Sequence, residues 1–179
     1  RNNFALNAGG AIGVNSGNLV NVQMRLENTL FYGNTGTKRG GGVYVDNGTG
    51  SISLKVLNST FWGNTSNKGG ALEVYRGIAT IGNCIFAGNS GSENISFSLY
   101  ETKPEISRGT LYNSLLDGAL SNGLTDGGGN LLNADPLFTD AVNNDFTLLS
   151  LSPAIDAGDN ILVTQSRDLG GNDRVSAKS

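Results

Sequence analysis

Two acidic residues give this sequence its most specific chemical possibility. Asp46 and Glu73 lie in short alternating segments that begin with a glycine pair, GGGVYVD and GGALEVY. Aligning these segments as neighbouring strands places the two carboxylates diagonally on the outward face, about 7–8 Å apart. Inverting glycosidases separate their general acid and general base by a similar distance. Asp46 and Glu73 are therefore the catalytic candidates.

The rest of the chain does not supply the partners that this chemistry uses. The sequence has no histidine, and Asp46 is the only aspartate before residue 117. No aligned column gathers several carboxylates with a lysine or arginine base. We therefore expect no catalytic residue here. Tyr44, Asp46, Glu73 and Tyr75 are the ligand-binding surface candidates, since aromatic rings beside hydrogen-bonding groups suit contact with a sugar or a protein. The plainer alternative is that they are ordinary surface residues.

A cluster of oxygen ligands near the C-terminus is the other chemical candidate. It comprises Asp156, Asp159, Asp168 and Asp173, in DAGDN and RDLGGNDR. Oxygen-rich loops beside glycines suit Ca²⁺, but this spacing matches no EF-hand. Ion pairs of Asp156 with Arg174 or of Asp168 with Arg167 are the alternative. We expect no cofactor, and calcium is the one candidate metal. The single cysteine, Cys84, excludes an internal disulfide.

The elements that would position these residues are repeats. Phe-x-x-Asn begins at Phe4, Phe31, Phe61 and Phe86, in steps of 27, 30 and 25 residues. The first three copies precede a glycine pair and an alternating apolar run, as in GGAIGV at residues 9–14. A further asparagine stands three residues before three of the phenylalanines and before Leu116; these are Asn28, Asn58, Asn83 and Asn113. Self-similarity at this period indicates a solenoid.

The inner period of two residues identifies the type of solenoid. Alternation in VNVQMRL and SISLKVL is typical of strands and excludes helical repeats. We predict an all-β fold, a right-handed parallel β-helix with about 25–30 residues per rung. Aligned residues then form columns about 4.8 Å apart. Phe31, Phe61 and Phe86 would make an aromatic stack, and the Asn28, Asn58, Asn83 and Asn113 amides would satisfy one another at a corner.

The regular pattern ends before the chain does. Residues 91–112 have no glycine pair and include Pro104, so we expect an edge, a loop or a displaced strand there. We divide the chain into rungs at 1–116 and the last rung or rungs with an irregular C-terminal cap at 117–179, all in one structural domain. The cap would plug the open end of the core with apolar side chains. These are Leu137, Phe138, Phe146, Leu148, Leu149 and Ile155.

Composition excludes several classes of protein. With 27 glycines, 23 asparagines and only 15% charged residues, the chain favours turns over helices. Residues 1–116 carry nine basic and six acidic side chains, and residues 117–179 carry three and nine. No basic stripe suggests a nucleic-acid partner. No apolar run is long enough for a transmembrane segment. The first residue falls inside a repeat, so we expect a fragment of a longer protein, and a monomer.

Two families resemble parts of this chain. The GGAI, GGGV and GGAL segments with their Phe-x-x-Asn motifs resemble, over residues 1–90, the repeats of chlamydial polymorphic outer membrane proteins. The stretches GGGNLLNADPLFTD, FTLLSLSPAIDAGDN and RDLGGNDRV are similar to the C-terminal part of the choice-of-anchor Q β-helix surface proteins of bacteria. These resemblances imply secretion and attachment to a bacterial surface. The anchoring signal of the second family does not occur in this sequence.

Two hypotheses of function, from different classes of protein, fit the sequence. The favoured one is a non-catalytic bacterial cell-surface or secreted β-helix protein, adhesin-like or a structural stalk, contacting a host-surface protein or a glycan. The alternative is the C-terminal part of a polysaccharide lyase or glycoside hydrolase of the pectate-lyase-like class, with catalytic rungs before Arg1. More repeats upstream would favour the first, and a cluster of carboxylates with lysine or arginine would favour the second.

Overall fold

The structure is a computed structural model that describes residues 1–17, 21–48, 50–98 and 107–174, and Pro104 lies outside them. The chain is all-β, and three parallel sheets form its body. The first sheet contains β2 (Ile12–Asn15), β6 (Val43–Asp46), β9 (Leu72–Tyr75) and β12 (Ile95–Ser98). The second contains β3 (Asn21–Glu27), β7 (Ser51–Leu57), β10 (Gly77–Gly82), β13 (Arg108–Tyr112) and β15 (Leu124–Asp126).

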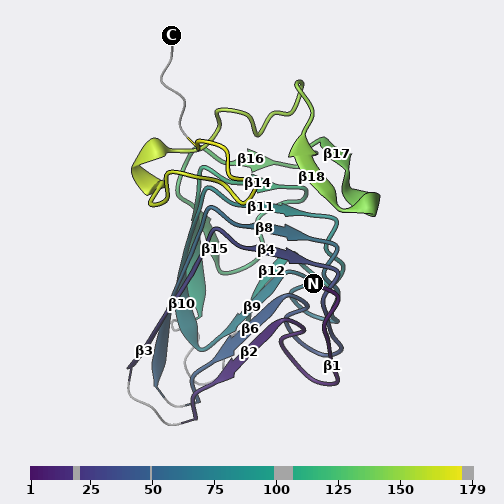
Figure 1. Cartoon of the computed structure of the whole chain (residues 1–179). Coiled ribbons are helices and arrows are strands. Elements are labelled where there is room, and N and C mark those ends of the chain that lie inside the picture. Colours follow the sequence, from purple (N-terminus) through teal and green to yellow (C-terminus); the bar gives the residue numbers. More distant parts are fainter. Residues whose placement is uncertain (18–20, 49, 99–106, 175–179) are drawn as a thin grey trace.

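The third sheet contains β4 (Leu30–Tyr32), β8 (Thr60–Trp62), β11 (Ile85–Ala87), β14 (Leu115–Leu116) and β16 (Leu131–Leu132). Between the third and first sheets, β1 (Phe4–Ala5) pairs with β5 (Thr35–Gly36). Within the described residues, the chain passes through the first, second and third sheets in that order four times, and a further, incomplete passage adds β15 and β16 to the second and third sheets. Figure 1 shows the three sheets as three sides around a common interior.

The interior is apolar because alternate residues of each strand point into it. Val43 and Val45 of β6 stand in register with Leu72 and Val74 of β9, and all four are fully buried. Ile52, Leu54 and Val56 of β7 supply the second side of the core. Pairing is in register over the whole of β3 and β7, so equivalent side chains lie directly above one another. The strand periodicity in the sequence is thereby confirmed.

The phenylalanines of the third sheet form the predicted aromatic stack. The ring of Phe61 lies 4.7 Å from the rings of both Phe31 and Phe86, with interplanar angles of 16° and 13°. All three rings are buried. Phe4 does not extend the stack, because it pairs with Thr35 and is 65% exposed. The first Phe-x-x-Asn is therefore not a structural copy of the others.

The asparagines of the same motif form a buried ladder that the sequence analysis did not assign. Asn34 donates its side-chain N–H to the Asn64 side-chain oxygen at 2.8 Å, and Asn64 donates to Asn89 at 2.9 Å. Asn3, not Asn7, continues the ladder by donating to Asn34 at 2.9 Å. Asn34 and Asn64 are fully buried, so these bonds satisfy amides that water cannot reach.

The second asparagine column occupies a corner, as predicted. Asn28, Asn58, Asn83 and Asn113 have φ angles of 51°, 50°, 52° and 44°, the left-handed region that asparagine tolerates. Mutual pairing of their amides is seen only between Asn83 and Asn58, at 3.1 Å, among the described residues. Asn58 and Asn83 bind the C-terminal part of the chain instead. The expectation that these side chains satisfy one another was therefore only partly right.

Residues 95–98 follow the repeat more closely than the sequence suggested. Although no glycine pair precedes them, Ile95 and Phe97 of β12 pair with Leu72 and Val74 of β9, and both are buried. β12 is the edge strand of its sheet, as one of the three expectations for 91–112 had it. The expectation of an edge, loop or displaced strand was wrong for β13, which pairs with β10 along five residues and with β15 on its other side. Apolar side chains at alternate positions suffice here without the glycines.

The C-terminal region does not plug the core. A hairpin of β17 (Phe138–Asp140) and β18 (Asp145–Leu148), joined by the 3-10 turn η2 (Ala141–Asn143), lies over the outer face of the third sheet (Figure 1). Phe138 makes an edge contact with Trp62 at 5.5 Å, and Phe146 lies 5.2 Å from Tyr32. Leu149 and Ile155 are 47% and 45% exposed. None of the six predicted plug residues belongs to the core cluster.

The tail then follows the asparagine corner back across the turns. The 3-10 turn η3 (Asn160–Leu162) lies beside Asn58 and Asn83. Beyond it, Thr164 donates a hydrogen bond to Glu27 at 3.3 Å. The tail therefore packs along the side of the sheets, because the aromatic rings of the third sheet and the corner amides offer it partners there.

The aromatic stack predicts that removing a stacked ring destabilises the protein more than removing a ring outside the stack. We expect Phe61→Ala to lower the free energy of unfolding by about 3–5 kcal/mol, since it opens a cavity between two rings. Phe4→Ala should change it by no more than about 0.5 kcal/mol. Urea denaturation followed by circular dichroism measures both. Equal effects of the two substitutions would contradict the observed register.

Candidate functional site

The candidate site lies on the side of the first sheet that faces away from the core. Tyr44 stands beside Glu73, and Asp46 stands beside Tyr75, in the register that the sequence analysis assumed. Ser96 and Ser98 continue these two columns on β12. Because Val43, Val45, Leu72 and Val74 point inward, this alternation directs the four candidate side chains to the opposite face.

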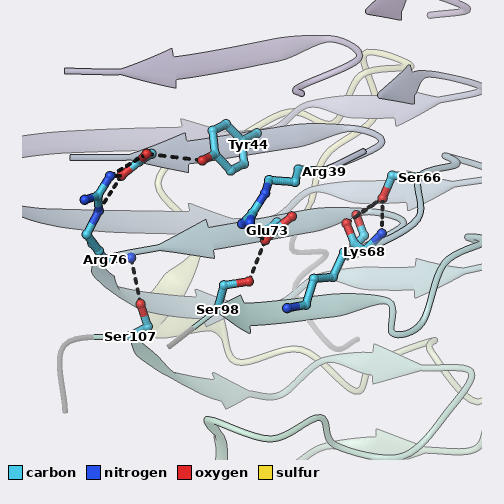
Figure 2. Close-up of polar contacts among 10 residues, drawn as sticks. Arg39, Tyr44, Ser66, Lys68, Glu73, Arg76, Ser98 and Ser107 are labelled. Carbon is cyan, nitrogen blue, oxygen red and sulfur yellow. Dashed lines mark hydrogen bonds and ion pairs between the residues drawn. The ribbon is translucent and has the colours of Figure 1, made fainter. Parts of the chain in front are cut away.

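Asp46 is held by an arginine from the next turn of the chain. Arg76 follows β9 directly, and its Nε and Nη2 atoms donate to the two carboxylate oxygens of Asp46, each at 2.8 Å. The backbone of Arg76 is left-handed, with φ of 63°, and its N–H donates to Ser107 Oγ at 2.7 Å. Asp46 also accepts from Tyr44 Oη at 3.2 Å. Figure 2 shows this paired geometry.

Glu73 is the most buried carboxylate of the site, with no exposed surface. Its Oε1 accepts from Arg39 Nη1 at 2.8 Å and from Ser98 Oγ at 2.6 Å (Figure 2). Its Oε2 is buried and has no hydrogen-bond partner among the described residues. A carboxylate with one satisfied and one unsatisfied oxygen is costly to keep ionised in the interior.

Tyr75 joins the two ion pairs. The guanidinium carbon of Arg39 lies 4.8 Å from the centre of its ring, and that of Arg76 lies 4.7 Å away. Both distances are within the range of cation–π attraction. The Arg39 side chain is 37% exposed and that of Arg76 is 22% exposed, so both cations reach the surface beside the ring. We call Tyr75, Arg39 and Arg76 the arginine–tyrosine surface.

Burial controls the ionisation of this site. Removal from water raises the pKa of the Glu73 carboxyl, and the Ser98 hydrogen bond and the Arg39 charge oppose that rise without cancelling it. Burial likewise raises the pKa of the Tyr44 hydroxyl, with a smaller contribution from the Asp46 charge. Tyr44 therefore remains a neutral donor to Asp46 at physiological pH.

The predicted carboxylate pair is adjacent but not open to solvent. Both side chains point away from the core, as the sequence analysis placed them, but Asp46 is 5% exposed and Glu73 is fully buried, so neither carboxylate is accessible at the surface. The reason is that Arg39, Arg76 and Ser98, which that analysis did not single out, pair with the carboxylates. Arg39 and Arg76 lie just outside the alternating strands, where periodicity gives no side-chain direction. The one sequence feature that could have indicated the pairing is that Arg76 directly follows β9 and Arg39 precedes the glycines before β6.

Three of the four aspartates proposed to bind calcium line one cavity, and the fourth lies outside it. Asp156, Asp168 and Asp173 line one cavity between the tail and the asparagine corner. Asp159 instead caps η3 by accepting from the Ile161 N–H at 2.9 Å. Asp168 accepts from the Asn172 N–H at 2.8 Å, and that hydrogen bond lowers the pKa of its carboxyl. The described residues contain no group of three or more acidic, cysteine or histidine side chains arranged to hold a metal ion.

The ion pairs among the described residues join Arg25 to Glu27, Arg39 to Glu73 and Arg76 to Asp46. They do not include the two alternatives considered for the tail, Asp156 with Arg174 and Asp168 with Arg167. Cys84 is buried, and burial raises the pKa of its thiol to about 12. The thiol is therefore protonated and packed, and it is a poor nucleophile.

Comparison with protein-family models, with curated proteins and with solved structures finds no match to this chain. Within the ranges that the structure describes, no helix has the length and apolar character that a membrane span requires.

The raised pKa of Glu73 predicts a specific pH dependence of stability. Because the folded protein binds this proton more tightly than the unfolded chain, whose carboxyl has a pKa near 4.5, Glu73 makes stability rise as pH falls through its folded pKa toward 4.5. Glu73→Gln should remove that rise. Urea midpoints measured between about pH 4 and pH 8 test it.

Glu27→Gln is the matched control. Its hydrogen bond with Arg25 lowers the pKa of the Glu27 carboxyl, so its contribution is present above pH 4.5 and is lost as pH falls below it. The two substitutions should therefore change the pH profile in opposite senses. Identical profiles of Glu73→Gln and the parent protein would show that Glu73 does not titrate as argued.

Proposed function

We propose that this chain is part of a right-handed parallel β-helix from a secreted or surface-attached bacterial protein, and that it serves as a non-catalytic contact surface. The observation that carries the proposal is the pairing of both candidate carboxylates with arginines. Their burial leaves the arginine–tyrosine surface, rather than a free acid and base, as the accessible part of the site.

The β-helix assignment is supported by the repeated order of the strands. Each passage of the chain adds one parallel strand to successive sheets, and the Phe31, Phe61 and Phe86 rings stack across three such passages. An extended stack of this kind makes a stiff rod, since each turn binds its neighbours through continuous ladders of backbone hydrogen bonds. A rod of this kind suits display of a surface away from the cell.

Catalysis by the carboxylate pair is disfavoured on chemical grounds. A general acid or base must exchange a proton with a substrate within hydrogen-bond reach. Both oxygens of Asp46 are engaged by Arg76, and Glu73 has no surface through which a glycan could approach. Opening the site for catalysis would require breaking both ion pairs and exposing Glu73.

The accessible groups suit recognition of a host-surface protein or a glycan. The ring of Tyr75 contacts both guanidinium groups, and the Arg39 guanidinium, which is 37% exposed, donates to Glu73 through Nη1 and keeps further N–H donors that Glu73 does not use. Guanidinium donors are well matched to carboxylate or sulfate groups of acidic sugars.

One observation favours the enzyme as a second candidate. Glu73 combines burial, a raised pKa and an unpartnered oxygen, and such a combination is found in general acids. Substitution of Glu73 therefore tests the hypothesis of a polysaccharide lyase or glycoside hydrolase. Asp46 offers no equivalent support, because its carboxylate is fully engaged.

We expect the purified chain to leave acidic and neutral polysaccharides intact and to bind a subset of acidic glycans on an array. Tyr75→Ala should weaken that binding about tenfold or more, since it removes the ring that both arginines contact. Phe4→Ala, which removes an exposed ring elsewhere, should have no effect.

Two outcomes would overturn the proposal. Glycan degradation that is lost in Glu73→Gln or Asp46→Asn would establish an enzyme. Equal binding by the parent protein and Tyr75→Ala would place the contact on another face.

A further inference from the structure

A cavity of about 370 Å³ lies between the asparagine corner and the C-terminal tail. Its volume is within the range of ligand pockets, about 300–1,000 Å³. Leu115 and Leu131 of the third sheet give it an apolar wall, and Asn83 and Asn113 of the corner column give it amides. This cavity is separate from the arginine–tyrosine surface, which belongs to the first sheet.

The corner column already binds a polypeptide backbone. Asn83 accepts from the Asp159 N–H at 2.9 Å and donates to the Asp159 carbonyl oxygen at 2.9 Å. Asp159 is extended, with φ of −94° and ψ of 121°. One side-chain amide thus holds both backbone groups of one extended residue, as a neighbouring strand would. Asn58 makes half of this contact by donating to the Leu162 carbonyl oxygen at 3.0 Å, while its oxygen accepts from Asn83.

Asn113 is the next member of this column and has the same left-handed backbone. It lines the cavity, yet its side-chain amide forms no hydrogen bond with the residues that the structure describes. Its main-chain N–H is satisfied by the Gly128 carbonyl oxygen at 2.9 Å. The Asn113 Oδ1 atom packs against Gly129, but neither the donor nor the acceptor of this amide has a hydrogen-bond partner among the described residues. The amide occupies a position equivalent to the one from which Asn83 binds Asp159.

The charge around the cavity selects a ligand. Asp156, Asp168 and Asp173 line it together with one cation, Arg174. The Nε atom of Arg174 donates to the Arg167 carbonyl oxygen at 3.0 Å. Asp156 and Asp173 have no side-chain hydrogen bond or ion pair within the described part of the chain. Two available carboxylates beside an available amide favour a cationic ligand with backbone-like hydrogen-bonding groups.

We propose that this cavity binds an extended, basic peptide segment of a partner protein, with Asn113 pairing to the N–H and C=O of one peptide residue. Asp156 and Asp173 bind a lysine or arginine side chain of that peptide, and Leu115 and Leu131 contact its apolar atoms. The tail stays in place and forms one wall. The site is independent of the proposed contact surface at Tyr75, so either proposal can fail without the other.

The probe is an acetylated and amidated octapeptide of alternating alanine and lysine. Its control is the same peptide with N-methylated alanines, which keeps every charge and removes backbone donors. We expect the first to bind the full chain in isothermal titration calorimetry and to shift the Asn113 side-chain amide resonances. The methylated peptide should bind about fivefold to tenfold more weakly, as for the loss of the one hydrogen bond that the unmethylated N–H donates to Asn113.

The protein variants separate the cavity from general attraction to the acidic tail. Asn113→Gly removes the amide while keeping a residue that tolerates positive φ, and should weaken binding about tenfold. Asn28→Gly, in the same column with the same backbone but outside the cavity, should leave it unchanged.

Equal affinity for both peptides would mean attraction by charge alone and would overturn the proposal. So would an Asn113→Gly variant that binds as the parent does. Absence of peptide binding, with the Asn113 resonances shifted instead by Ca²⁺ or by an amino sugar, would assign the cavity to a different ligand.

Discussion

The pairing of each strand with its equivalent one turn earlier is the constraint on which the structure depends. In-register parallel pairing places like residues directly above one another, so any side chain that points inward must tolerate its own kind as a neighbour. Phenylalanine meets this condition by ring stacking, and asparagine meets it because its amide carries both a donor and an acceptor. The buried Asn34–Asn64–Asn89 ladder is the polar form of the same solution. A buried carboxylate cannot repeat in this way without a cation.

The need of a buried carboxylate for a neighbouring cation explains the arrangement of the candidate site. Asp46 and Glu73 lie on neighbouring strands, and two buried charges of one sign at this spacing repel each other. Arg76 and Arg39 offset the repulsion from the two ends of the strands, and Tyr75 keeps the two guanidinium groups apart while contacting both. Removing either arginine would leave a buried unpaired carboxylate, which costs more than the ion pair contributes. The cluster is therefore best understood as one unit whose outer side is the arginine–tyrosine surface.

The sequence predicted the features that depend on the two-residue alternation of strands. Its predictions failed for residues outside the strands. Alternation identified the strands, the inward columns and the Phe31–Phe61–Phe86 stack, because side-chain direction in a strand follows from position alone. Arg39 and Arg76 lie outside the strands, so the burial of Asp46 and Glu73 could not be inferred from the spacing of residues. The tail was misplaced for a similar reason. Phe138 and Phe146 are apolar enough to enter a core, but only the structure reveals that Tyr32 and Trp62 offer an aromatic surface outside it.

The two asparagine columns differ in what they leave available. In the buried ladder, each amide is used by the amides above and below it and by the backbone. At the corner, Asn83 turns both its donor and its acceptor to the extended residue Asp159, although it also donates to Asn58. The tail is therefore held there by side-chain amides rather than by a continuous backbone ladder. Segments with few backbone pairings open at lower free energy than the sheets they cover. The asparagine corner is thus the part of the molecule where one polypeptide segment can most easily be bound beside another.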